Sequence, residues 1–164
     1  MGTLDLRAIQ LMVPIQDRAA TTSRSPHQNA VMSLMQDAGW FADCPGTWRT
    51  SVQITLDSGQ DPTIRAAIPG MLQWLRQFQQ HVFTDDSVAE TDQDENGGMK
   101  PPVIDQVWNG PPCHRVTVHG TLVSWSLDAL GWLAAFLAEA GAQHGVSTPT
   151  LITASRNEVD GTTA

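Results

Sequence analysis

Ser51-Val52-Gln53-Ile54-Thr55-Leu56-Asp57 is a run in which apolar and polar side chains alternate without a break. Successive side chains of a strand point to opposite faces, so Val52, Ile54 and Leu56 would share one face and the polar residues the other. The run therefore predicts a strand with one buried face. A strand of this kind needs a second layer, and the segments around it supply helices for that layer.

The pattern L-x-W-L-x-x-F occurs twice in the chain, at 72–78 and at 130–136. Its apolar residues recur with helical spacing, so we expect a helix over 64–83 and another over 127–140. In the first, Pro69-Gly70 predicts a kink or a broken first turn, and the firm part is 71–82. The repeat is either the ordinary pattern of two amphipathic helices or the trace of a duplicated unit. Both interpretations place the same apolar residues in the core: Leu72, Leu75, Leu130, Leu133 and Phe136.

Three further strands are expected, over 103–108, 115–119 and 148–155, and Gly120 predicts a bulge before 122–125. From the first strand onward the order is then β-α-β-β-α-β, the split arrangement of ferredoxin-like domains. The sequence therefore predicts an α+β fold with a four-stranded, mostly antiparallel sheet. Right-handed crossovers would place both helices on one face of that sheet.

Two N-terminal helices are expected before the sheet. Residues 4–18 carry apolar side chains at helical spacing, although Pro14 should kink or end that helix. The second helix, 25–38, begins with Ser25 as a cap and is stopped by Gly39.

We expect one α+β domain over residues 1–156. Its N-terminal helices lie within 4–38 and its sheet-helix core within 51–155. Residues 157–164 look like a disordered tail.

The chain has 9 Lys+Arg against 17 Asp+Glu, a formal net charge of −8. Such a charge repels a phosphate backbone, so nucleic acid is not an expected direct partner. Two cysteines, no Asn-x-Ser/Thr sequence, no basic N-terminal leader and no long apolar run favour a cytoplasmic protein without a membrane segment. One lysine against eight arginines is typical of a high-GC bacterial or phage genome.

The motifs that could carry chemistry are incomplete. Residues 92–97 match the first half of a calcium loop, but Lys100 and Val103 stand where later ligands are required. Cys113 and His114 are adjacent, so on a strand they would point to opposite faces. No zinc-ligand spacing and no glycine-rich phosphate loop is present. We therefore expect no catalytic residue, no cofactor and no metal site.

Residues 84–98 hold six acidic side chains and no basic one, which predicts a solvated loop whose charges lack local counterions. Tryptophans near the ends of elements could anchor a partner or cover the core; these are Trp40, Trp48, Trp108 and Trp125. The binding residues predicted from the sequence are Asp85, Asp86, Asp92, Asp94, Glu95, Trp108, Trp125 and His119.

Three classes of function fit these observations. The first is a non-catalytic, acidic protein-binding module of the immunity, antitoxin, anti-defence or accessory-subunit type, whose partner has a basic surface. The second is a small enzyme or ligand carrier with a pocket between sheet and helices, using a residue such as Asp57, His114 or His119. The third is a phage structural assembly protein that uses edge strands and tryptophans in a repeated interface. A homo-oligomer is compatible with each, and the first is the function that we predict.

Overall fold

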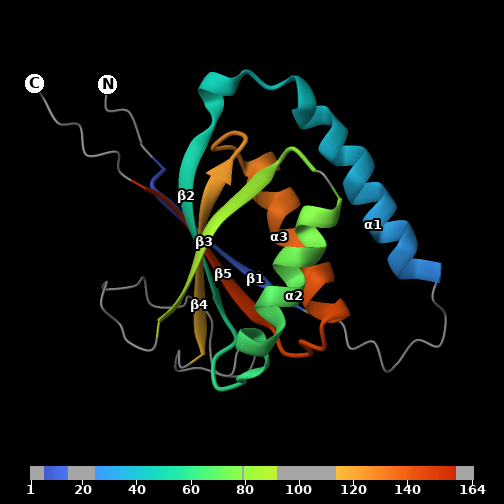
Figure 1. Ribbon diagram of the computed structural model, residues 1–164, viewed down its shortest axis with the longest axis vertical. Helices are drawn as coiled ribbons and strands as arrows, with labels where there is room; N and C mark the ends of the chain where they lie inside the picture. The colour runs from blue at the N-terminus through green and yellow to red at the C-terminus, as the bar shows by residue number, and fades with distance from the viewer. Residues whose placement is uncertain (1–5, 15–24, 79, 92–113, 158–164) are drawn as a thin grey trace, which may run out of the picture.

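The computed structural model describes residues 6–14, 25–78, 80–91 and 114–157 (Figure 1). The elements in this part of the chain follow in the order β1 (Ala8–Val13), α1 (Ser25–Ala38), the 3-10 turns η2 (Gly39–Asp43) and η3 (Gly46–Trp48), β2 (Thr50–Asp57), α2 (Thr63–Gln77), β3 (Phe83–Thr91), β4 (Arg115–Leu122), α3 (Leu127–Gln143) and β5 (Thr150–Arg156).

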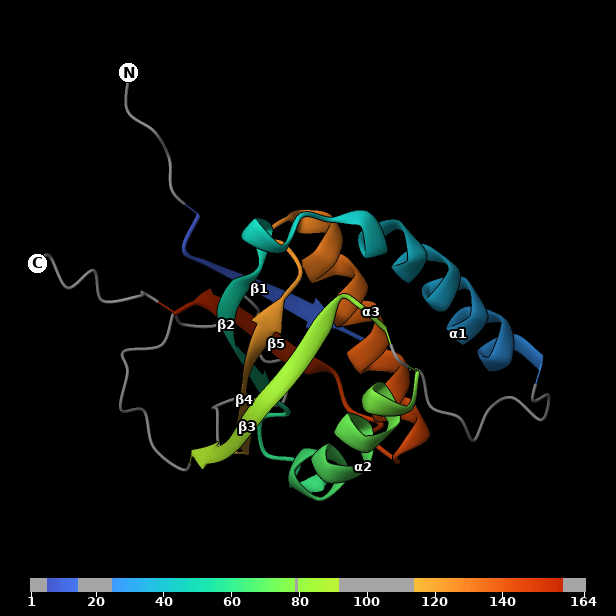
Figure 2. The same cartoon turned by 45° about the horizontal axis from the view of Figure 1, so that its top comes forward.

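The strands form one five-stranded sheet in the order β1-β5-β2-β4-β3, in which all neighbours are antiparallel. Helices α2 and α3 lie side by side against one face of this sheet, and α1 lies outside α3, farther from the strands (Figures 1 and 2). The indole Nε1 of Trp132 in α3 donates to the carbonyl oxygen of Leu34 in α1 at 2.6 Å. The predicted α+β fold is thus confirmed, as is the placement of both core helices on one face.

The strand predicted over 51–57 is β2, and it pairs along its whole length with β4. Helix α3 begins as expected, because the side chain of Ser126 accepts a hydrogen bond from Ala129 N at 3.2 Å. Helix α2 runs through Pro69 but ends at Gln77, earlier than predicted. Gln80 Oε1 then accepts from the backbone N of Val82 and of Phe83, at 2.7 and 2.8 Å, and this turn leads directly into β3.

The first N-terminal helix was predicted wrongly, because Ala8–Val13 is the strand β1. The apolar spacing of this segment fits a helix, but Ile9, Leu11 and Val13 also alternate, and these three pack against the core. Pro14 follows directly and cannot donate to a ladder. The sheet consequently has five strands instead of four, and only the second N-terminal helix, α1, is confirmed.

The loop predicted over 84–98 is also wrong in its first half, because Phe83–Thr91 is the strand β3. Its charged side chains are compatible with an edge strand, which has only one neighbour. The expected bulge lies in β3 and not in β4: Asp85 pairs with Gly120 and Ser87 with His119, so Asp86 is the extra residue. The predicted strand 103–108 lies outside the described residues.

Gly120 lies on β4 opposite this bulge, and its hydrogen faces the ring of Phe83. A Cβ at this position would lie 2.4 Å from the carbonyl oxygen of Thr84 and 2.6 Å from Phe83 Cζ. Only glycine therefore allows β3 and β4 to approach this closely.

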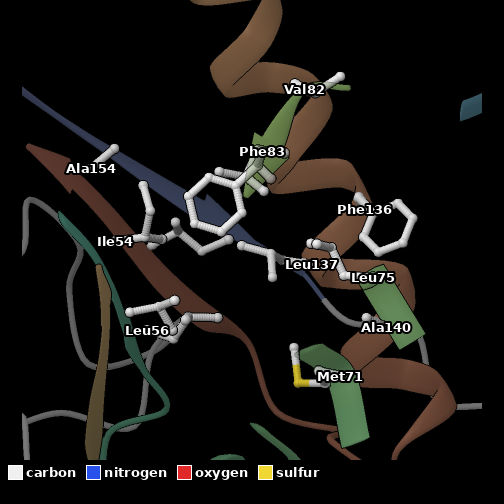
Figure 3. Close-up of a cluster of buried hydrophobic side chains, with 14 of the residues drawn as sticks. Ile54, Leu56, Met71, Leu75, Val82, Phe83, Phe136, Leu137, Ala140 and Ala154 are labelled. Carbon is white, nitrogen blue, oxygen red and sulfur yellow. The ribbon is translucent and has the colours of Figure 1, made fainter. Parts of the chain in front are cut away.

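The core fills the space between the sheet and the helices α2 and α3 (Figure 3). All five residues predicted for it, Leu72, Leu75, Leu130, Leu133 and Phe136, are buried. The two L-x-W-L-x-x-F segments meet here. Trp74 lies 4.8 Å from Phe136 between ring centroids, and Trp132 stacks on the same Phe136 at 5.1 Å. Whatever the origin of the repeat, its aromatic residues join the two helices.

Candidate binding surface

Large apolar side chains are exposed at one end of the molecule. They belong to the turns between α1 and β2, to the first residue of α3 and to the segment before β1, and their exposed fractions are 79% for Trp40, 57% for Trp48, 66% for Leu127 and 48% for Leu6. Figures 1 and 2 both show the η2–η3 segment and the beginning of α3 at this end. We call the residues Leu6, Trp40, Trp48, Trp125 and Leu127 the tryptophan surface.

Local backbone turns hold two of these rings outward. In η2 two neighbouring side chains have different surroundings: Phe41 is buried in the core, whereas Trp40 faces solvent. Cys44 N donates to Phe41 O at 3.2 Å, and Trp48 N donates to Pro45 O at 3.0 Å. The rings therefore project from hydrogen-bonded turns.

Trp125 joins the tryptophan surface to the first strand. Its Nε1 donates to the carbonyl oxygen of Leu6 at 2.7 Å, and the guanidinium of Arg156 lies 6.0 Å from its ring centroid. The ring is half-buried, so it contributes both to the fold and to the surface. Among the predicted binding residues that the structure describes, Trp125 is the one that lies on this surface.

Exposed charged residues lie close in sequence to three residues of the tryptophan surface. Asp37 and Asp43 stand on either side of Trp40 in the chain, and Asp128 follows Leu127. Arg49 follows Trp48 and is also exposed. Trp40 and Leu127 consequently have acidic neighbours in the sequence, whereas Trp48 has a basic one.

The structure describes two of the predicted acidic residues, Asp85 and Asp86, and their surroundings differ. Asp85, in β3, forms an ion pair with Arg76 in α2, so the expectation that this segment lacks a counterion is wrong for Asp85. The pair raises the pKa of Arg76, first through the hydrogen bond and then through the charge of Asp85. Asp86 is exposed at the bulge. Asp92, Asp94, Glu95 and Trp108 lie outside the described residues, as does the half-matched calcium loop.

His119 lies on the face of the sheet opposite the helices. In register it is flanked by Gln53 of β2 and Ser87 of β3. Nearby, Thr55 Oγ1 and Thr117 Oγ1 are 3.1 Å apart, within hydrogen-bonding distance. The register partners of His119 on both neighbouring strands are thus polar and uncharged.

A second polar cluster lies where β2 ends and β4 begins. Asp57 is buried and accepts from Arg115 Nε at 2.8 Å and from Gly59 N at 2.8 Å. Asp61 accepts from Thr63 N at 2.9 Å and from Thr148 Oγ1 at 2.8 Å. These bonds connect the β2–α2 turn to β4 and to the segment before β5.

Burial by itself would raise the pKa of Asp61. The hydrogen bonds from Thr63 and Thr148, together with the charge of His114, outweigh burial and set the pKa below its ordinary value of 3.8. The Asp61 carboxylate is therefore an ionised cap of α2. Both Asp57 and Asp61 have structural roles that account for their contacts.

One gap between the sheet and the helices is lined by residues that the structure describes. This gap, lined by residues of β1, β2, β5, α2 and α3, including Leu56, Met71 and Leu137, has no room for a water molecule. Among the described residues, no three His, Cys, Asp or Glu side chains are grouped as a metal site would need. In the same part of the chain, none of the helices has the length and apolar character needed to cross a bilayer.

No protein-family model, curated protein or solved structure is significantly similar to the chain. The residues of the tryptophan surface are accordingly interpreted from their geometry. Sequence reasoning identified Trp40 and Trp48 as rings at element ends, and Leu6 and Leu127 carried no signal beyond their apolar character.

Proposed function

We propose that the protein is a non-catalytic, acidic binding module that acts on another protein, in the cytoplasm of a bacterium or as the product of a phage. The observation that carries this proposal is the exposure of Trp40 and Trp48 on hydrogen-bonded turns, in a chain whose helical Trp132 is buried. Tryptophan is enriched among residues that dominate binding energy, because its large ring loses few rotamers on burial.

The charge of the protein supports a partner with a basic surface. A net charge of −8 accelerates encounter with a positively charged protein and disfavours nucleic acid. Close to the surface, Asp37 and Asp43 beside Trp40 would pair with basic residues at the rim of the contact. The apolar rings then supply the short-range attraction.

We also propose that β2 to β5 form a ferredoxin-like unit, to which β1 and α1 are added. The element order β-α-β-β-α-β and the strand order β5-β2-β4-β3 support this assignment. The tryptophan surface would then be built on a rigid unit, with η2 and η3 entering it at the start of β2.

The test begins with chemical crosslinking of the tagged full chain in its host, followed by purification of the crosslinked protein. Binding is then measured with the purified pair by surface plasmon resonance at several salt concentrations. Trp40→Ala and Trp48→Ala should each weaken binding by about tenfold or more. The association rate should fall as salt rises.

Val88→Thr is the matched control, because Val88 is also an exposed apolar residue but lies within β3. It should leave the Kd within about twofold of the wild-type value. Equal affinity of the wild type and both tryptophan variants would overturn the assignment of the surface. An association rate insensitive to salt would overturn the electrostatic part, and a small molecule retained through purification would favour the enzyme or carrier class.

A further inference from the structure

Burial repeats every three residues where α1 passes into η2. Ala38 and Phe41 are buried and belong to the core. Asp37, Trp40 and Asp43 are exposed. Side chains three residues apart lie on the same side of a 3-10 helix and are near neighbours on an α-helix. Asp37, Trp40 and Asp43 therefore form one row with an indole between two carboxylates, which we call the acidic indole row.

The acidic indole row is accessible to another molecule. The turn η2 follows α1 at one end of the protein (Figures 1 and 2), and the exposed fraction of Trp40 is 79%. A 3-10 helix rises about 2 Å per residue, so neighbouring members of the row are about 6 Å apart along its axis. A planar cation that lies on the ring of Trp40 can therefore reach a carboxylate next to that ring.

The charges near the acidic indole row complement a cation supplied by a partner. Residues 25–48 contain no lysine and no arginine, and the chain as a whole has a net charge of −8. The same surface already contains one contact between an arginine and an indole, because the guanidinium of Arg156 lies 6.0 Å from the ring centroid of Trp125. Trp40 offers a similar ring with a larger exposed area and with two exposed carboxylates beside it.

We propose that the acidic indole row binds an arginine side chain of the partner protein, an inference that rests on the proposed function and specifies the chemistry that its surface recognises. A guanidinium group is planar, so it stacks on the face of an indole. Its N–H groups point outward in its own plane and donate to carboxylates in charge-assisted hydrogen bonds. The ammonium of lysine is a compact point charge without a planar face. The row therefore selects arginine over lysine.

Titration of the isotope-labelled full chain, followed by nuclear magnetic resonance, tests the proposal. The probes are acetylated, amidated peptides of sequence Gly-X-Gly-X-Gly, in which X is arginine, lysine or uncharged citrulline. The arginine peptide should shift the indole Nε1–H signal of Trp40, assigned by its loss in Trp40→Phe, and the amide signals of Gly39 and Ala42. Its Kd should be lower than that of the lysine peptide by about threefold or more. The citrulline peptide should cause no shift at the same concentrations.

Variants of the row separate local recognition from the effect of net charge. The double variant Asp37→Asn/Asp43→Asn should raise the Kd of the arginine peptide by about fivefold or more. Gln73→Lys/Gln77→Lys is the matched control, because it changes the net charge by the same amount at exposed positions of α2. Figures 1 and 2 both show α2 away from η2, so the control should leave the Kd within about twofold of the wild-type value. Circular dichroism checks that both variants are folded.

The outcomes distinguish this inference from the proposed function. Equal affinity for the arginine and lysine peptides, or an equal loss of affinity in the double variant and its control, would overturn the inference. A crosslinked partner that binds through Trp40, with no preference for the arginine peptide at that ring, would also overturn it and would leave the proposed function standing. Arginine-selective binding at Trp40 without any crosslinked partner would support the arginine site and count against the proposed function.

Discussion

Replacing Gly120 by alanine is expected to destabilise the protein by about 3 kcal/mol, at the upper end of the usual cost of overpacking. The new Cβ would lie 2.4 Å from Thr84 O and 2.6 Å from Phe83 Cζ, whereas ordinary contacts lie between 3.4 and 4 Å. An ångström of overlap must therefore be relieved. Phe83 is buried and cannot turn outward, and Thr84 is held by its pairing with Thr121. The strain falls on the β3–β4 ladder at the bulge.

Gly131→Ala is the matched control, since it makes the same chemical change in the exposed part of α3. Nothing lies within 4 Å of a Cβ at Gly131, so alanine should stabilise the helix there by about 0.5–1 kcal/mol. Both variants are compared with the wild type by urea denaturation followed by circular dichroism, with the slopes checked for equality. A Gly120→Ala variant within about 0.5 kcal/mol of the wild type would refute the steric reasoning.

Two other substitutions test the core and the α2 cap. Leu133→Ala should lower the free energy of unfolding, measured by urea denaturation, by about 2–5 kcal/mol, because it leaves a cavity in the buried face of α3. Asp86→Asn at the exposed bulge should change it by less than about 0.5 kcal/mol. The reverse order would contradict the core assignment. Asp61→Ala should cost about 1 kcal/mol at pH 7 through the lost cap. The pKa of Asp61 lies below 3.8 in the folded protein, so its contribution is complete above that pH and is lost as the pH falls through the folded pKa. The difference in the free energy of unfolding between Asp61→Ala and the wild type should therefore become smaller below pH 3.8. An equal difference at pH 7 and pH 3 would show that the ionisation of Asp61 does not contribute to the cap.

The elements that could be predicted from sequence are those with one dominant pattern. Strict alternation over 51–57 identified β2, and continuous helical periodicity after Ser126 identified α3. Strand β1 was missed because six apolar and neutral residues satisfy both periodicities at once. Its strand conformation is decided by pairing with β5, which lies at the other end of the chain.

Strand β3 was not predicted from the sequence for a different reason. Acidic composition correctly indicated that Asp86 is solvated, but solvated side chains do not exclude a paired backbone at a sheet edge. The counterion of Asp85 could not be predicted either, because Arg76 belongs to the preceding helix and meets Asp85 only through the turn between them. The candidate surface could not be predicted for the same reason. Trp40 and Phe41 are adjacent in sequence, and only the fold determines which of them faces solvent.

Because β5 lies between β1 and β2 in the sheet, its position determines when β1 can pair during synthesis. Ala8 leaves the ribosome well before its partner Ser155, because the two residues are far apart in the sequence. During synthesis β1 therefore remains without this neighbour until β5 has emerged, while β2, α2 and β3 can already associate. The uncharged AIQLMV segment lacks its strand partner during this interval, and an unpaired apolar segment of this kind is prone to aggregate. The sheet is complete only after β5 has inserted between β2 and β1.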